Sequence, residues 1–422
     1  KIHTSHSTPG LLQMEKTLPE NTPPETNRMI SVLDKLSQFS LFTFAAFSMF
    51  SISVTQIAFA IGAISWLLKV HLTQTWKELR GTMVGVAILC FCLACILSII
   101  TSVDMASSVK LLKKLIQFVI FFWVANSVQE EKQRSLLVVL VIVSGTAAAL
   151  GGLTQILLDG SYRYVFTAGI KGTLSKESTY SGVLMMVGLM AVARCLFHKP
   201  KAYWVIGGTG LIGLAILYGL ARQAWLGFFI GTVFLVFVWN KKYLLVLPLI
   251  LLSLFLLSPD GVKKRILSLQ NVNDLSLQHR VIVWESGWEI FKDYPLTGCG
   301  YKCVDSIHHQ YPSHDLLRYY VGMHSNIFQL LVDTGIVGFG AWVFIWITYF
   351  IEVFKRFRGL AEKTYRGSSK SLLMGSSAAV LAYLVGGFFE TNFYDSEISM
   401  LLYFLVGLSL SKVTKAPKVV TR

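Results

Sequence analysis

The chain has 422 residues, of which 54% are hydrophobic and 14% are charged, with a formal net charge of +15. Apolar runs of 16–25 residues recur along almost its whole length, which indicates membrane-spanning helices and excludes a soluble globular protein or an outer-membrane barrel. Most basic residues lie in short loops between these runs, so membrane topology explains the charge and nucleic acid is not an expected partner.

The first 35 residues are polar and rich in proline, and we expect residues 1–35 to form a flexible cytoplasmic tail. The sequence begins with lysine, so Met14 is a candidate for the natural start. The segments that follow predict an all-α, polytopic membrane protein of about twelve transmembrane helices. The predicted spans are 36–51, 53–69, 83–101, 107–127, 134–157, 177–197, 202–219, 220–238, 243–258, 324–352, 371–389 and 397–413.

Charge predicts the orientation of these spans. The loops after the even-numbered spans contain basic stretches such as "KVHLTQTWKELR" and "EVFKRFRGLAEKTYRGSSK", whereas the opposite loops "TSVDMASS" and "ETNFYDSE" contain no Lys or Arg. The positive-inside rule therefore places both termini in the cytoplasm, with one exception, "KLLKK" at 110–114, whose side chains could snorkel to headgroups. We divide the chain into helices 1–9 (36–258), an outer loop subdomain (259–323), helices 10–12 (324–413) and a cytoplasmic tail (414–422).

This topology leaves two long segments on the outer side, 159–179 and about 258–323. In the second, Val281–Phe291 has apolar residues at helical spacing and ends before Pro295, which predicts an amphipathic helix on the membrane surface. Cys299 and Cys303 also fall on this side, where a disulfide is permitted, and their spacing leaves both a bridge and free thiols open.

Three ionisable residues stand where the apolar runs meet the outer face. Arg222 lies at the turn between spans 7 and 8, Arg280 begins the amphipathic helix, and His324 opens span 10. Each alone has an ordinary explanation: a snorkelling or paired arginine, a solvated charge, and a structural histidine. A helix N-terminus disfavours the protonated imidazole, so we expect His324 to be a neutral base.

Together the three residues suit a diphosphate ester. A guanidinium binds phosphate oxygens through two parallel hydrogen bonds and stays charged in a partly dry site. A neutral imidazole can remove a proton from an attacking hydroxyl. Two arginines would neutralise a diphosphate leaving group, so this chemistry needs no metal or other cofactor.

The motifs "ARQAWLG" (221–227), "HRVIVWESGWEIFKDYPLTGCG" (279–300) and "HSNIFQLLVDTGIVG" (324–338) resemble the O-antigen ligase and polymerase superfamily of bacterial envelope proteins. The resemblance implies a glycosyltransferase at the periplasmic face of the inner membrane. Its donor would be an undecaprenyl-diphosphate-linked glycan and its acceptor a sugar of the lipid A core. By position, Arg222 and Arg280 would hold the diphosphate and His324 would activate the acceptor hydroxyl.

The same resemblance implies an acidic residue in the outer loop before the last span, for which Glu390 fits best and Asp395 is a rival. A ligase is the favoured interpretation, because one late outer loop carries most of the outer charge. A polymerase of lipid-linked repeat units and a protein O-glycosyltransferase remain open. A secondary transporter predicts charges near the bilayer midplane, where only Arg194 and Asp333 come close. Asp333 could cap a buried donor or support His324.

Overall fold

The computed structural model describes residues 24–78, 82–158, 169–199, 202–258, 260–268, 275–311, 314–319, 322–360 and 367–411, and within these ranges it contains helices and no strand. The helices are α1 (Pro24–Phe47), α2 (Ile52–Thr73), α3 (Met83–Ile100), α4 (Met105–Ser108), α5 (Leu112–Leu115), α6 (Val119–Ser127), α7 (Glu131–Leu158), α9 (Glu177–Phe197), α10 (Tyr203–Tyr218), α11 (Arg222–Asn240), α12 (Leu247–Leu257), α13 (Asp260–Leu267), α14 (Leu275–Asp293), α15 (Val304–Ile307), α16 (His314–Tyr319), α17 (Asn326–Leu360), α18 (Gly367–Gly386) and α19 (Ser396–Ser409).

The all-α prediction is confirmed, and the chain is a membrane protein. In the described residues, 7 helical segments are long and apolar enough to cross a bilayer, and α10 and α19 are shorter apolar helices. The fourth predicted span, 107–127, is a succession of α4, α5 and α6 joined by 3₁₀ turns. The count of twelve spans therefore stays a prediction.

The helix α1 begins inside the segment predicted to be a flexible tail. Pro24 is its first residue and Glu25 lies in its first turn, where proline and an acidic side chain both favour a helix start. Asp34 forms an ion pair with Lys69 of α2 at 2.5 Å, which ties this extension to the next helix. The expectation of flexibility is thus wrong for residues 24–35, and residues 1–23 lie outside the described part of the chain.

The interior of the molecule is formed by α9, α18 and α19. In the most apolar windows of α9 and α18, 72% of the residues are buried, whereas large apolar side chains such as Phe39 and Leu257 point outward as expected for contact with lipid. Small residues allow the central helices to approach each other. A Cβ on Gly227 of α11 would lie 2.8 Å from the carbonyl oxygen of Ala382 in α18.

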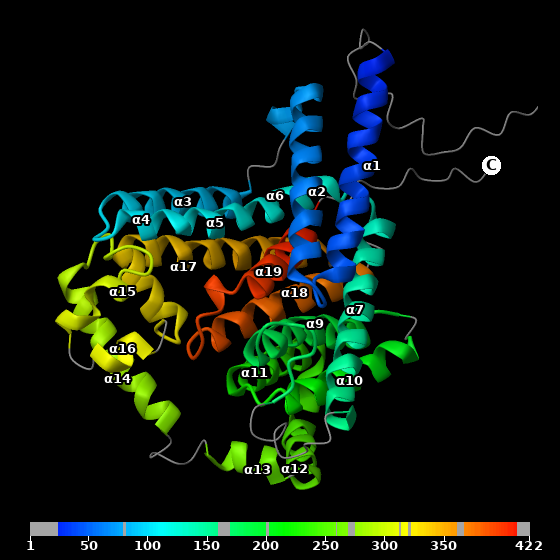
Figure 1. Cartoon of the computed structure of the whole chain (residues 1–422). Helices are drawn as coiled ribbons and strands as arrows, with labels where there is room; N and C mark the ends of the chain where they lie inside the picture. The colour runs from blue at the N-terminus through cyan, green and yellow to red at the C-terminus, as the bar shows by residue number, and fades with distance from the viewer. Residues whose placement is uncertain are drawn as a thin grey trace, which may run out of the picture.

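The predicted outer loop contains α13 to α16, and α14 confirms a helix at Val281–Phe291, while its position on the membrane surface stays a prediction. Figure 1 shows α14, α15 and α16 gathered beside the beginning of α17. These elements share a hydrophobic cluster separate from the main core, formed by Val283, Ile290, Cys299, Cys303, Val304, Ile307, Tyr311, Leu317, Met323 and Val332. Cys299 and Cys303 are joined as a disulfide within this cluster, which answers the question that their spacing left open.

The outer loop is joined to α17 at a break in the helix. Gly335 has φ 62°, and the chain around Pro295–Gly300 enters the gap. The amide of Ile336 donates to the Pro295 carbonyl at 2.9 Å, and the amide of Gly300 donates to the Asp333 carbonyl at 3.1 Å. A Cβ on Gly335 would lie 2.3 Å from the Leu296 carbonyl oxygen, so only glycine fits. Gly298 and Gly335 are therefore both explained by this one backbone contact, because a Cβ on Gly298 would also lie 2.4 Å from the backbone of Asp333.

Candidate functional site

His324 lies two residues before α17, in a backbone conformation that only a few side chains adopt. Its φ is 47°, in the left-handed region, where non-glycine residues are uncommon and often functional. Asn326, the first residue of α17, holds the loop between α18 and α19. Its amide donates to the Gly387 carbonyl at 2.7 Å, and its Oδ1 accepts from the amide of Phe393 at 2.9 Å. The "HSN" motif thus fixes the loop that carries Glu390.

The carboxylate of Glu390 pairs with the imidazole of His324. Glu390 Oε1 lies 3.3 Å from His324 Nδ1, and the amide of Thr391 donates to the same oxygen at 3.3 Å. Burial alone would raise the pKa of Glu390, but the hydrogen bond and charge of His324 and the charge of Arg280 lower it overall. The carboxylate therefore remains ionised and lies against Nδ1 of the imidazole.

Arg280 lies on α14, and its charge acts on the Glu390 carboxylate of this pair. One turn further along α14, Trp284 Nε1 donates to the Met323 carbonyl at 2.8 Å, and the indole stacks on Phe328 with ring centroids 5.5 Å apart. These contacts anchor α14 beside the residue that precedes His324. The charge of Arg280 acts on the carboxylate of Glu390, so the two residues lie within electrostatic range of each other, and their roles stay predictions.

Arg222 is held by a contact with α13. It is the first residue of α11, and its Nη2 donates to Ser268 Oγ, at the end of α13, at 2.6 Å. The acidic rival Asp395 has a structural role, since it accepts from the amides of Glu397 and Ile398 at the start of α19 and from Thr179 Oγ1. The structure thus groups His324, Glu390 and Arg280 and places Arg222 on the α11–α13 side.

A cavity of about 280 Å³ opens beside the His324–Glu390 pair. Neither Arg222 nor Arg280 is among the described residues that line it. Burial first, and then the charges of Asp333 and Asp305, raise the pKa of the lining residue Tyr301 to about 12, so its phenol is a neutral hydrogen-bond donor. The lining residues are Lys176, Ser178, Tyr301, Lys302, Val304, Asp305, Gly322, His324, Gln329, Glu390, Thr391, Asn392, Tyr394 and Asp395.

Asp333 is fully buried beneath this cavity. Gln329 Nε2 donates to both carboxylate oxygens at 3.1 Å, and the hydroxyl of Tyr394 donates to Oδ2 at 2.7 Å. Gln329 Oε1 in turn accepts from the amide of Met323 at 2.9 Å. Asp333 therefore accepts from buried donors, which is one of the two roles considered for it from the sequence, and only Gln329 links it to the backbone next to His324.

Several cavity residues were not predicted from the sequence. Lys176, Tyr301, Lys302 and Tyr394 come from separate segments, and only folding brings them together. Lys114, in the stretch expected to snorkel, instead donates to the Tyr394 carbonyl at 2.6 Å and to Ser396 Oγ at 2.8 Å. The sequence offered one signal for these cavity residues. It was a lysine, Lys114, predicted at the outer end of a span, on the same side as the carboxylates of the loop before the last span.

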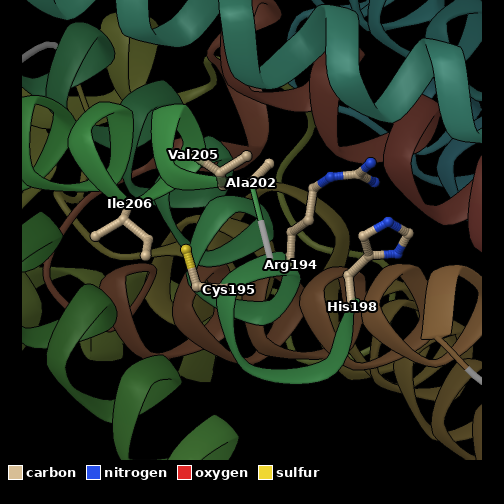
Figure 2. A pocket seen from close by; sticks show the side chains of 6 residues that line it. All are labelled: Arg194, Cys195, His198, Ala202, Val205 and Ile206. Atoms are coloured by element: carbon tan, nitrogen blue, oxygen red, sulfur yellow. The ribbon is translucent and has the colours of Figure 1, made fainter. Parts of the chain in front are cut away.

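A second, much smaller crevice lies at the other end of α9. Figure 2 shows the Arg194 guanidinium and the His198 ring on the same side of it, away from Cys195 and Ile206. Its volume of about 10 Å³ holds no more than a water molecule. Burial and then the charge of Arg194 lower the pKa of His198. At 1.5 Å per residue, Arg194 lies roughly 27 Å along α9 from Lys176.

Residues 207–343 match the family model described as O-antigen ligase. The matched stretch includes Arg222, Arg280 and His324 and ends before Glu390. It supports membership of the O-antigen ligase and polymerase superfamily and confirms the resemblance that the motifs indicate. No curated protein matches the chain.

Proposed function

We propose that the protein is an O-antigen ligase. It transfers a glycan from undecaprenyl diphosphate to a sugar of the lipid A core at the periplasmic face of the inner membrane, with both termini in the cytoplasm. The family match supports a glycosyltransferase of the ligase or polymerase type and lipid-linked substrates. The observation that carries the proposal is the His324–Glu390 pair, 3.3 Å apart, at the mouth of a polar cavity with the charge of Arg280 beside it.

The chemistry assigned to these residues is a direct displacement. The acceptor hydroxyl oxygen attacks the anomeric carbon of the donor, and its proton passes to Nε2 of His324, the ring nitrogen opposite the Glu390 contact. The bond between the anomeric carbon and the phosphate oxygen breaks, and its electron pair leaves with the lipid diphosphate. Arg280 and Arg222 bind that leaving group, and Glu390 stabilises the imidazolium that forms.

The orientation of the site rests on three observations. The loop "ETNFYDSE" that carries Glu390 contains no Lys or Arg, which favours the outer side. The Cys299–Cys303 disulfide lies in the subdomain that packs against the site, and such bonds persist in oxidising compartments such as the periplasm. Arg194 and Lys199, near the opposite end of α9, carry the positive charge expected of a cytoplasmic end.

The decisive experiment uses purified protein, a glycan linked to undecaprenyl diphosphate, and core lipid either present or absent. A ligase moves the glycan to the core lipid and releases undecaprenyl diphosphate. Lengthening of the lipid-linked glycan without core lipid would identify a polymerase instead. The absence of both products, with the protein folded, would overturn a glycosyltransferase role.

A further inference from the structure

Two lysines line the cavity and have no counter-charge bound to them. Lys176 is the N-cap of α9, and Lys302 lies in the loop before α15 with φ 60°. Both side chains are exposed, and in the described parts of the chain neither forms an ion pair. The cavity therefore presents two available positive charges next to the catalytic pair.

Two of the carboxylates around the same cavity are already satisfied. Glu390 binds His324 and the amide of Thr391, and Asp395 caps α19. A cation also acts on each of them: the charge of Arg280 on Glu390, and on Asp395 the charge of Lys114, which donates to the residues on either side of it, Tyr394 and Ser396. Asp305 is the third carboxylate of the lining and is the one left to face the two lysines. The open part of the cavity is thus suited to an anion.

The arginines approach the catalytic pair from elsewhere. Arg280 lies on α14 and Arg222 at the start of α11, and neither is among the described residues that line the cavity. Donor and acceptor must meet at His324, so a donor diphosphate on the arginine side leaves the lysine side for the acceptor. A volume of about 280 Å³ is close to the lower end of ligand pockets and has room for one substituted sugar ring.

We infer that the cavity is the acceptor subsite and that Lys176 and Lys302 bind a negatively charged group, a phosphate or a carboxylate, on the acceptor sugar. This inference rests on the proposed function and deepens it by assigning the acceptor specificity to two residues outside the arginine and histidine motifs. A neutral acceptor would leave both ammonium groups without a partner and would bind more weakly.

The test compares Lys176→Gln, Lys302→Asn and the double variant with the unchanged protein. Asparagine tolerates the left-handed backbone at 302 and keeps the amide there. With core lipid as acceptor, the acceptor KM of the double variant should rise about tenfold, while the donor KM and kcat at saturating acceptor stay within about twofold. Lys171→Gln, which removes an exposed lysine of the same outer segment outside the cavity, should change nothing.

Modified acceptors identify the anionic group. If phosphate is bound, the difference between the unchanged protein and the double variant should vanish on dephosphorylated core lipid. If the difference persists there and vanishes on core lipid whose acidic sugars are reduced to alcohols, a carboxylate is bound. If the acceptor KM of the double variant differs from that of the unchanged protein on both modified acceptors, the lysines do not bind a charged group of the acceptor and the inference is overturned.

Two further results would also overturn the inference. A rise in donor KM with unchanged acceptor KM would assign the lysines to the donor, and unchanged constants in the double variant would remove their role. Direct binding of core lipid, followed by protein fluorescence without donor, measures the subsite independently of turnover. If core lipid binds through the lysines but no glycan is transferred, the proposed function fails while the subsite stands.

Discussion

The cavity at His324 and the crevice at His198 both combine a histidine with a neighbouring arginine, yet only the first has the features of a reactive site. His324 pairs with Glu390 at 3.3 Å and faces a cavity of about 280 Å³. His198 lies beside Arg194 at a crevice of about 10 Å³, where the arginine charge lowers the pKa of its imidazole (Figure 2).

The comparison shows that a carboxylate partner and space for a substrate distinguish the two sites, whereas residue type does not. An imidazole paired with a carboxylate can accept a proton, because the resulting imidazolium is stabilised. A neighbouring guanidinium charge disfavours the protonated form of an imidazole and lowers its pKa. The two regions therefore supply matched controls for each other.

The largest effect is expected from His324→Ala. Loss of a general base typically lowers the rate about 10²–10⁴-fold. We expect a decrease of this size in kcat for glycan transfer, with normal membrane insertion and thermal stability. His198→Ala, the matched variant at the crevice, should retain nearly full activity. Near-normal turnover of purified His324→Ala would show that another group is the base.

Asp333→Asn should be the next most damaging change. The fully buried carboxylate accepts hydrogen bonds from Gln329 and Tyr394. The asparagine NH₂ group cannot accept, so one of these two donors would lose its partner. A buried group left unsatisfied costs about 1–3 kcal/mol, so the melting temperature should fall by several degrees.

Because Gln329 also holds the amide of Met323, kcat should fall more than either KM in Asp333→Asn. Gln329→Leu, which removes the link but keeps Asp333, should reproduce the loss of kcat. Exposed Asp260→Asn should leave both stability and kcat unchanged. Equal kcat in Asp333→Asn and the unchanged protein would limit Asp333 to a role in stability.

Arg280→Lys and Arg222→Lys test the donor site. Lysine keeps the charge but loses the planar fork that binds a phosphate through two hydrogen bonds, so the donor KM should rise about tenfold for Arg280→Lys. We expect a smaller rise for Arg222→Lys, because its guanidinium also binds Ser268 at 2.6 Å. Arg194→Lys at the crevice should not alter the donor KM. Unchanged donor affinity in both site variants would move the diphosphate elsewhere.

Much of the site could be predicted from the sequence, because its central residues stand at unusual positions along the chain. A histidine at the start of an apolar run and an arginine at the start of an amphipathic helix are visible without a structure. The partner Glu390 needed the family resemblance, since nothing local distinguishes it from Asp395. Folding separates them: Asp395 caps α19, while Asn326 holds the loop that directs Glu390 to His324.

The rest could not be predicted because it depends on contacts between distant segments. Lys176 and Lys302 are 126 positions apart, and no periodicity relates them. The break at Gly335 is invisible in an apolar pattern that continues on both sides of it. The predicted end of the N-terminal tail was also misplaced. The polar segment 24–35 has no apolar pattern, yet it is helical because it begins with helix-start residues and forms an ion pair with α2.

Glu390→Gln should change the acid sensitivity of the protein. The folded-state pKa of Glu390 is lowered, so its contribution to stability is complete above the ordinary value of 4.5 and is lost as the pH falls through the lowered value. Over that acidic range the melting temperature of the unchanged protein should fall more steeply than that of Glu390→Gln, by a difference on the order of 1 °C.

Glu289→Gln provides the control for this measurement. Its carboxylate pairs with Lys292 on the exposed surface of α14 and should contribute almost nothing. Parallel melting curves for Glu390→Gln and the unchanged protein across the acidic range would mean that the His324–Glu390 pair does not stabilise the folded state. His198 is no control for this measurement, because its lowered pKa costs stability as the pH falls below its ordinary value of 6.5.

The smallest effect, none at all, is expected from chelation of metal ions. A divalent cation at a diphosphate would need carboxylates close to the leaving group, but Glu390 is bound to His324 and Asp395 to the start of α19. Arg280 and Arg222 supply two fixed positive charges, equal to the charge of one divalent ion, and a positive site attracts cations weakly. Transfer should therefore proceed at an unchanged rate in excess EDTA.

The control for chelation adds Mg²⁺ or Mn²⁺ to the chelated enzyme, which should also have no effect. Activity lost with EDTA and restored by either ion would replace the two-arginine mechanism with a carboxylate site centred on Glu390, and Glu390→Gln would then abolish the response to metal.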